Sequence, residues 1–304
     1  MSDIARSWAI ILAGGEGQRL KSFIRTLYPD DRPKQFATII GKRSMLRHTL
    51  DRVRLLFPTH QILTIIDQAH IPYVKGDLCD QPPSTLIVQP CGRETGPGIL
   101  LPLISVFQRD PEAYVAIFPS DHFILEEVKF MGYIEYALAH ATRFPHHVIT
   151  LGIAPQYADA NYGWIGKGEM IASHQNKTLY HVRNFVEKPS VELVGHLHDS
   201  GHLWNSMVLV GSVKTFLQQF ELLLPDLYEA FIVLKSALGT SEEAAALQQL
   251  FEKIPSVNFS LAFLERIKKD FYVLEVGDVF WSDWGEEHRI RRDVELLGLK
   301  IVSH

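Results

Sequence analysis

Two cationic side chains follow a glycine-rich break near the start of the chain. Gly14, Gly15 and Gly17 come directly after a short apolar run, and Arg19 and Lys34 lie just beyond them. Glycines leave backbone N–H groups open to a ligand, and a guanidinium and an ammonium each hold anionic oxygens. This stretch therefore favours polyphosphate binding. The alternative interpretation is a tight strand-to-loop turn with two solvated cations.

Two well-known phosphate-binding loops do not fit this stretch. The dinucleotide fingerprint needs a third glycine where the chain has Leu20. The P-loop ends in Gly-Lys followed by Ser or Thr, whereas Gly41 and Lys42 are followed by Arg43. We therefore expect neither a redox dinucleotide loop nor a P-loop.

A carboxylate follows another apolar run. Asp121 comes after residues 114–118, in the segment Phe-Pro-Ser-Asp-His. Beside a phosphate site, a carboxylate at a strand end is suited to holding a hard cation, because such ions prefer oxygen ligands. The alternative is that Asp121 caps a turn, as aspartate commonly does. We expect His122 to orient this turn, because Mg²⁺ prefers oxygen to nitrogen.

A second glycine-containing loop follows the apolar run of residues 86–88. It extends from Gln89 to Pro97 and leads into an expected helix. Glycine next to a helix N-terminus makes a loop with free N–H groups, which favours ligand binding. The alternative is an ordinary connection between a strand and a helix.

Strands and helices alternate through the first half of the chain. Short apolar runs predict strands, and apolar residues at helical spacing predict helices. This alternation predicts an α/β fold with a mostly parallel sheet, helices on both faces, and ligands at the carboxyl ends of the strands. The expected strands are residues 8–13, 62–66, 86–88, 114–118 and 148–151, and the expected helices are residues 45–56, 98–107 and 128–140.

The pattern changes in the second half. We expect two longer strands that flank a polar turn at 173–177 and form one wall of the site, and a helical subregion at about 212–270. The prediction is one domain over residues 1–290, followed by a short C-terminal tail at 291–304. The expected strands here are residues 162–169, 179–187, 203–210, 271–276 and 279–281, and the expected helices are residues 215–220, 226–238 and 241–253.

The composition is typical of a folded globular chain. Of the 304 residues, 46% are apolar and 21% are charged. The formal net charge of −5 argues against nucleic-acid binding, which favours a basic surface. No apolar run approaches the roughly 20 residues of a membrane span, and the first run is too short for a signal peptide. Cys79 and Cys91 match neither zinc nor redox spacing, so we expect free thiols and a cytoplasmic location.

Taken together, these motifs resemble those of one enzyme family. Residues 12–20 read Leu-Ala-Gly-Gly-Glu-Gly-Gln-Arg-Leu and residues 33–36 read Pro-Lys-Gln-Phe. This resembles the signature of sugar-phosphate nucleotidyltransferases, in particular the mannose-1-phosphate guanylyltransferases. Later segments resemble the family in the same order, among them Val-Glu-Lys-Pro at 186–189 and Trp-Ser-Asp-Trp-Gly at 281–285. The resemblance implies a Rossmann-like nucleotidyltransferase domain that uses Mg²⁺ to join GTP and mannose 1-phosphate, giving GDP-mannose and pyrophosphate.

The resemblance also implies a role for each matching residue. The expected catalytic residues are Arg19, Lys34, Asp121 and Lys188, and the expected metal ligands are Asp121 and Asp283. The expected nucleotide-binding residues are Ala13, Gly14, Gly15, Gly17, Gln89, Gly92, Arg93, Thr95 and Ser120. The expected sugar-phosphate-binding residues are Gly163, Trp164, Glu187 and Asn205.

Some positions depart from the family pattern. Gln89 replaces an acid, Glu94 replaces an asparagine, Met207 stands in place of a glycine, and Gln18 and Ser260 also differ. Two alternatives therefore stay open: the same chemistry on a different sugar 1-phosphate or nucleotide, or an inactive regulatory homologue that binds a nucleotide sugar. We expect no nucleic-acid or membrane partner, and a homodimer is one assembly to test.

Overall fold

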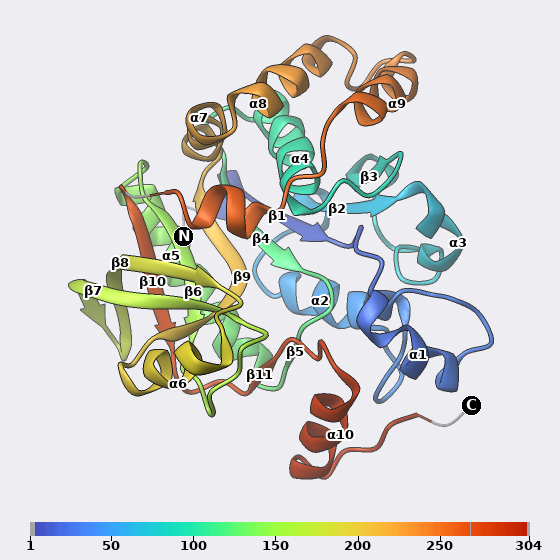
Figure 1. Ribbon diagram of the computed structural model, residues 1–304. Coiled ribbons are helices and arrows are strands. Elements are labelled where there is room, and N and C mark those ends of the chain that lie inside the picture. Colours follow the sequence, from blue (N-terminus) through green and yellow to red (C-terminus); the bar gives the residue numbers. More distant parts are fainter. Residues whose placement is uncertain (1–3, 268, 303–304) are drawn as a thin grey trace.

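A nine-stranded sheet forms the centre of the computed structural model, which describes residues 4–267 and 269–302 (Figure 1). The strand order is β3-β2-β1-β4-β9-β6-β10-β8-β7. In this sheet β8 and β9 run against the other seven strands. The strands are β1 (Ser7–Leu12), β2 (Ile62–Asp67), β3 (Leu86–Gln89), β4 (Tyr114–Pro119), β6 (Val148–Ile153), β7 (Gly163–His174), β8 (Lys177–Glu187), β9 (Leu203–Ser212) and β10 (Phe271–Val276).

Helices cover the sheet and extend beyond its edges. In the first half of the chain, each predicted strand and helix is present, and its ends lie within three residues of those expected. The α-helices of the described chain are α1 (Lys21–Leu27), α2 (Met45–Val53), α3 (Ile71–Val74), α4 (Thr95–Arg109), α5 (Glu127–Arg143), α6 (Val191–Asp199), α7 (Val213–Leu223), α8 (Pro225–Ile232), α9 (Glu243–Lys253) and α10 (Glu287–Leu296).

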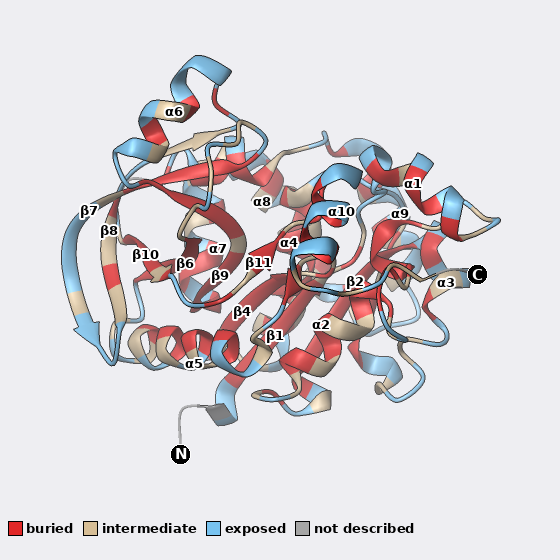
Figure 2. Ribbon diagram, turned by 90° about the horizontal axis from the view of Figure 1, so that it is seen from below, coloured by how far each residue is buried: buried red, intermediate tan, exposed pale blue. Residues whose placement is uncertain are grey.

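Alternate residues of the central strands face two hydrophobic cores. In β1, Ala9 and Ile11 belong to the core that includes residues of α2 and α5. Ile10 belongs to the opposite core, which includes residues of α4, α7, α8 and α9. Because both faces are covered, these strands are continuous apolar runs that are buried along their length (Figure 2). The predicted α/β fold with a mostly parallel sheet is confirmed.

The two longest strands form a hairpin. β7 and β8 pair antiparallel across a turn at Gln175 and Asn176, whose φ angles of 49° and 62° fit a two-residue hairpin turn. At its base, β7 also pairs with β9 through Trp164 and Trp204. The base therefore continues the sheet toward the predicted site, whereas the far end of β7 is largely exposed (Figure 2).

Four helices and one strand pair differ from the expectation. The segments of α1, α3, α6 and α10 are helical, although no helix is expected there from the sequence. The strand expected at 279–281 is the short β11 (Trp281–Ser282), which pairs with β5 (Phe123–Ile124) outside the central sheet. A third hydrophobic core joins α1 to α10. The helix α10 has residues on both sides of residue 290, where the sequence predicts that the domain ends. The members of this core include Leu20, Phe23, Ile24, Leu27, Phe123, Trp284, Ile290 and Val294.

The cysteines and the helices bear on two expectations drawn from the sequence, free thiols and the lack of a membrane span. Cys79 and Cys91 are both free and exposed, as predicted. Within residues 4–267 and 269–302, no helix combines the length and the apolar character that crossing a bilayer requires.

Candidate active site

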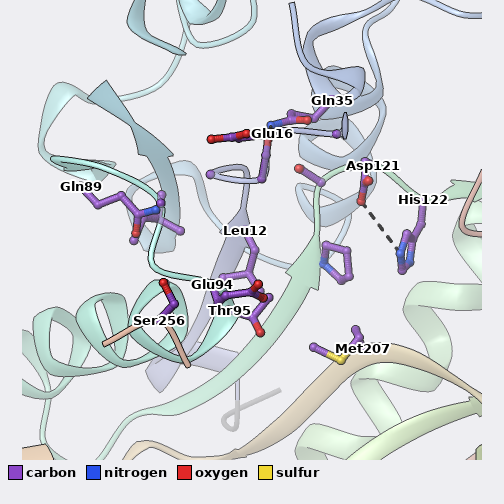
Figure 3. Close-up of a pocket in the computed structure, with 18 residues that line it drawn as sticks. Leu12, Glu16, Gln35, Gln89, Glu94, Thr95, Asp121, His122, Met207 and Ser256 are labelled. Carbon is purple, nitrogen blue, oxygen red and sulfur yellow. Dashed lines mark hydrogen bonds and ion pairs between the residues drawn. The ribbon is translucent and has the colours of Figure 1, made fainter. Parts of the chain in front are cut away.

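A cavity of about 580 Å³ opens where β1, β3 and β4 end (Figure 3). Its wall includes Leu12, Gln89 and Pro119, the last residues of these three strands. This is the end of a parallel sheet at which ligands bind. The predicted site residues that line the cavity are Gly14, Gly15, Gly17, Gln89, Gly92, Thr95, Ser120 and Asp121.

The loop after β1 needs glycine at two positions. A β-carbon on Gly14 would come within 2.8 Å of the Gln89 side-chain nitrogen. Gly17 has a φ of 62°, and a β-carbon there would lie 3.2 Å from the backbone nitrogen of Lys34. Larger residues would therefore strain or displace this loop, which runs along the cavity wall.

Gln35 holds the same loop in place from behind. Its Nε2 donates hydrogen bonds to the carbonyl oxygens of Ala13, at 3.0 Å, and Gly15, at 2.6 Å. Ala13 is fully buried, and its N–H donates to the carbonyl of Ile65. This residue therefore supports the loop and does not line the cavity. Gln35 belongs to the Pro-Lys-Gln-Phe motif, and this supporting role was not predicted.

A buried polar pair lies at the β3 side of the cavity. Gln89 Nε2 donates to Asp67 Oδ1, at the end of β2. Burial raises the pKa of Asp67, although the hydrogen bond from Gln89 opposes this. Gln89 Oε1 is buried and has no hydrogen-bond partner among the described residues. An unpaired buried acceptor in a cavity wall offers a contact for an N–H group of a ligand. Asp67 was not predicted.

Arg93, in the loop between β3 and α4, does not line the cavity. Its Nε donates to the carbonyl of Phe251 at 2.8 Å, so its guanidinium is anchored to α9. Thr95 lines the cavity, and its hydroxyl accepts a hydrogen bond from the backbone nitrogen of Phe259 at 2.9 Å. The loop thus connects the wall of the cavity to the helical subregion.

The Lys34 ammonium lies in a cage of oxygens. It is 2.9 Å from Asp121 Oδ2, and it donates to the carbonyls of Asp283 at 2.5 Å and Trp284 at 3.2 Å. Only 4% of the Lys34 side chain is exposed. The cage brings the segment after β1 together with the turn at Asp283, so both predicted metal ligands lie around one positive charge.

Both of these carboxyl groups are held in the ionised form. Burial alone would raise the pKa of Asp121 and of Asp283. Lys34 supplies the largest opposing contribution at both groups, Arg289 adds to it at Asp283, and together the opposing contributions leave both pKa values below the ordinary value. Ionised carboxylates that converge in this way can hold a divalent cation.

The predicted sugar-side residues form a neighbouring cluster. A β-carbon on Gly163 would lie 2.8 Å from Glu187 Oε2 and 3.3 Å from the β-carbon of Asn205. Burial raises the pKa of Glu187, although Lys188 opposes this from 3.9 Å. Asn205 Oδ1 accepts a hydrogen bond from the backbone nitrogen of Met207. Its Nδ2 has no hydrogen-bond acceptor among the described residues, which leaves a donor for a ligand hydroxyl.

Arg19 lies between this cluster and the turn at Asp283. A β-carbon on Gly285 would come within 2.6 Å of Asp283 Oδ2 and 3.1 Å of Arg19 Nη2, which places the two side chains close together. The charge of Arg19 is also among those that oppose the burial of Glu187. Arg19 therefore adds positive charge where the two parts of the site meet.

Trp164 does not reach the site in this structure. It is fully buried, and its Nε1 donates to the carbonyl of Asp159 at 3.0 Å. Its ring packs edge-on against Trp204 in the core. The other predicted residues of the sugar side, Gly163, Glu187 and Asn205, do lie together.

A second group of metal-ligating side chains lies at the amino ends of β6 and β10. Ligand atoms of His146, His147 and Asp270 lie within 4.8 Å of one another. His147 is buried, and burial followed by the neighbouring histidines lowers its pKa to about 4. These residues directly precede β6 and β10, at the strand ends opposite to the cavity, so they take no part in it.

Curated proteins named as mannose-1-phosphate guanylyltransferases are similar to this chain. The chain is 30% identical over 286 residues to mannose-1-phosphate guanylyltransferase 2 of Escherichia coli O157:H7. The aligned region covers 91% of this chain and 58% of the relative. The chain is 32% identical to mannose-1-phosphate guanylyltransferase RfbM of Salmonella typhimurium, with coverage of 91% and 56%. The chain thus spans a little over half the length of these relatives.

Solved structures share the fold at lower identity. A crystal structure from Thermus thermophilus, described as a mannose-1-phosphate geranyltransferase, has a TM-score of 0.77 and 24% identity. The match covers 92% of this chain and 76% of the chain in that structure. A mannose-6-phosphate isomerase structure from Helicobacter pylori has a TM-score of 0.72 and 17% identity, with coverage of 91% and 99%.

The family assignment rests on most of the chain. The family model described as nucleotidyl transferase matches residues 8–291, which include the glycine loop, the Lys34 cage and the turn at Asp283. This agrees with the resemblance found in the sequence motifs. The chain belongs to the nucleotidyl transferase family.

Proposed function

We propose that this protein joins GTP and mannose 1-phosphate to give GDP-mannose and pyrophosphate. One observation carries the proposal: Lys34, Asp121 and Asp283 converge beside a cavity lined by the glycine loop. Arg19 lies close to Asp283 and also acts on Glu187, so it links the three residues to the sugar-side cluster. The activity named for the curated relatives supports the same substrates.

The proposed reaction is an in-line displacement at the α-phosphorus of GTP. A phosphate oxygen of mannose 1-phosphate forms the new bond to phosphorus, and the bond to the β-phosphate oxygen breaks, so pyrophosphate leaves. Such a transfer depends on positioning and on charge stabilisation more than on proton transfer. Arg19 would stabilise the departing pyrophosphate, and the exposed ammonium of Lys188 would hold the incoming phosphate.

We propose Mg²⁺ as the metal, held by Asp121 and Asp283. The donor set fits, because carboxylate oxygens suit this cation and Asp283 Oδ2 has no hydrogen-bond or ion-pair partner among the described residues. When bound, the cation would neutralise charge on the phosphate oxygens. Lys34 would keep the two carboxylates together and charged.

Glu187 and Asn205 would bind sugar hydroxyl groups. The Glu187 carboxylate can accept a hydrogen bond and the free Asn205 Nδ2 can donate one. The base would lie against Gln89, whose unpaired Oε1 accepts from an N–H donor. Guanine presents such donors on its Watson–Crick edge and therefore fits this acceptor. Cytoplasmic location and homodimeric assembly stay predictions.

A substrate panel tests the proposal. Pyrophosphate release is measured for four nucleoside triphosphates against several sugar 1-phosphates in Mg²⁺. GTP with mannose 1-phosphate should react fastest, and Asp121→Asn should abolish turnover. Asp199→Asn, on an exposed carboxylate, is the matched control. A faster reaction with another pair would identify different substrates, and nucleotide-sugar binding without any turnover would favour the inactive regulatory homologue.

A further inference from the structure

The turn that carries Asp283 has a strained backbone. Trp284 has a φ of 43°, in the left-handed region that bulky side chains rarely adopt. The Trp284 ring is fully buried and stacks on Phe123 with the centroids 4.5 Å apart. Its Nε1 donates to Asp293 Oδ2 on α10 at 3.1 Å. Strained backbones persist only where surrounding contacts hold them, and at this turn α10 supplies some of those contacts.

Arg289, also on α10, binds the neighbouring carboxylate directly. Its side chain is fully buried, and its Nη1 donates to Asp283 Oδ1 at 2.7 Å. Its Nη2 is 3.0 Å from Asp159 Oδ2, and its guanidinium lies 4.5 Å from the centre of the Tyr162 ring. Arg289 is therefore fixed from three sides while it holds Asp283.

One oxygen of Asp283 is fully occupied and the other is free. Oδ1 accepts from Arg289, from the Tyr162 hydroxyl at 3.0 Å and from the backbone nitrogen of Gly285 at 3.0 Å. No described residue donates to Oδ2, and this atom lies on the side of Arg19. Three donors on a single oxygen fix both the rotation of the carboxylate and the direction of its second oxygen.

We propose that Arg289 is a positioning residue that holds Asp283 by Oδ1, so that only Oδ2 is presented to the metal ion. The inference rests on the proposed function, because it concerns the metal ligand named there. It makes α10 a working part of the metal site, although the helix lies outside the central sheet (Figure 1). The rival explanation is that Arg289 only anchors α10 to Asp159.

Mn²⁺ binding separates these two explanations. The affinity is measured by electron paramagnetic resonance of free Mn²⁺, with GTP present and the sugar phosphate absent. Arg289→Lys should weaken Mn²⁺ binding about tenfold or more, the usual scale for losing a group that orients a metal ligand. Tyr162→Phe, which removes one donor to Oδ1, should weaken it by a smaller factor. GTP affinity in metal-free buffer should stay unchanged in both variants.

Asp159→Asn is the matched control, because it breaks the other ion pair of Arg289 and leaves the contact with Asp283 intact. Its Mn²⁺ affinity should equal that of the unmodified protein. The inference is overturned if the Arg289 and Tyr162 variants fold and bind Mn²⁺ normally, or if Asp159→Asn weakens binding as much as Arg289→Lys. If the unmodified protein neither binds Mn²⁺ with any nucleotide nor releases pyrophosphate, the proposed function fails as well.

Discussion

Replacing Lys34 with methionine removes one buried positive charge and keeps a side chain of similar length. The ammonium has three close oxygen partners, the Asp121 carboxylate and the carbonyls of Asp283 and Trp284. The variant leaves these oxygens without their cation. It therefore measures how much the cage contributes to the stability of the fold and of the site.

The size of the effect follows from burial. Removing one partner of a buried ion pair costs about 3–5 kcal/mol, because the remaining charge stays desolvated. The side chain of Lys34 is 4% exposed, but that of Asp121 is 36% exposed, so water reaches and screens the carboxylate. We therefore expect Lys34→Met to lower the free energy of unfolding by about 3 kcal/mol, at the lower end of that range.

The loss should also depend on pH. Lys34 helps to hold the pKa of Asp121 and Asp283 below the ordinary value of 3.8. A carboxyl group with a lowered pKa in the folded state stabilises the fold fully above its unfolded pKa, and this contribution is lost as the pH falls through the folded value. The difference between Lys34→Met and the unmodified protein should therefore be largest near neutral pH and shrink in acid.

Urea denaturation followed by tryptophan fluorescence measures this difference. Lys214→Met is the matched control, because Lys214 pairs with Glu112 at the surface and should contribute less than about 1 kcal/mol. A loss below about 1 kcal/mol for Lys34→Met would refute the reasoning, because a buried pair would then behave like a surface pair. A loss that grows in acid would refute the assigned direction of the pKa shifts.

Three further substitutions test contacts at other positions of the structure. Gly163→Ala should raise the KM for the sugar phosphate much more than that for GTP, because the new β-carbon would lie 2.8 Å from Glu187 Oε2. Gly152→Ala should cost about 1–3 kcal/mol of stability, because its β-carbon would lie 2.6 Å from a valine methyl group in the core. His147→Gln should flatten the loss of stability between pH 6.5 and 4, because a pKa lowered from 6.5 to about 4 makes protonation of the folded state cost about 3 kcal/mol.

Each of these substitutions has a matched control. Gly195→Ala introduces a β-carbon with no atom within 4 Å, so both KM values should stay unchanged, and it should not destabilise the fold because alanine is favoured over glycine within the helix α6. His60→Gln, at an exposed histidine, should leave the pH dependence unchanged. Equal KM changes for both substrates in Gly163→Ala, a neutral Gly152→Ala, or an unchanged acid profile in His147→Gln would contradict the corresponding argument.

The central sheet could be predicted because its strands are buried on both faces. Short, largely apolar runs such as residues 62–66 favour buried strands. The helix α1 was missed although Leu20, Phe23, Ile24 and Leu27 recur at helical spacing, because the glycines directly before it favour an irregular loop. The helix α10 buries Arg289 and Asp293 together with its apolar residues, so the usual division into apolar and charged faces fails there.

Residues of the candidate site that lie far apart in sequence could be grouped only where the motifs have a fixed order along the chain. The convergence of Lys34, Asp121 and Asp283 followed from the resemblance to a family, because no local pattern links residues so far apart. Trp164 could not be placed from sequence, since an aromatic residue at a strand start suits a core as well as a sugar site. Arg289 gave no signal, because an arginine on a charged helix is usually exposed.

The hydrogen bond between Lys34 and the carbonyl of Asp283 joins residues that are 249 positions apart. During translation, the glycine loop and the first strands leave the ribosome long before this acceptor has been synthesised. A nascent chain can therefore assemble most of the sheet before the turn at Asp283 is available to complete the Lys34 cage. Under the proposed function, competence for catalysis would arise only after α10 has been synthesised and has docked beside the turn at Asp283.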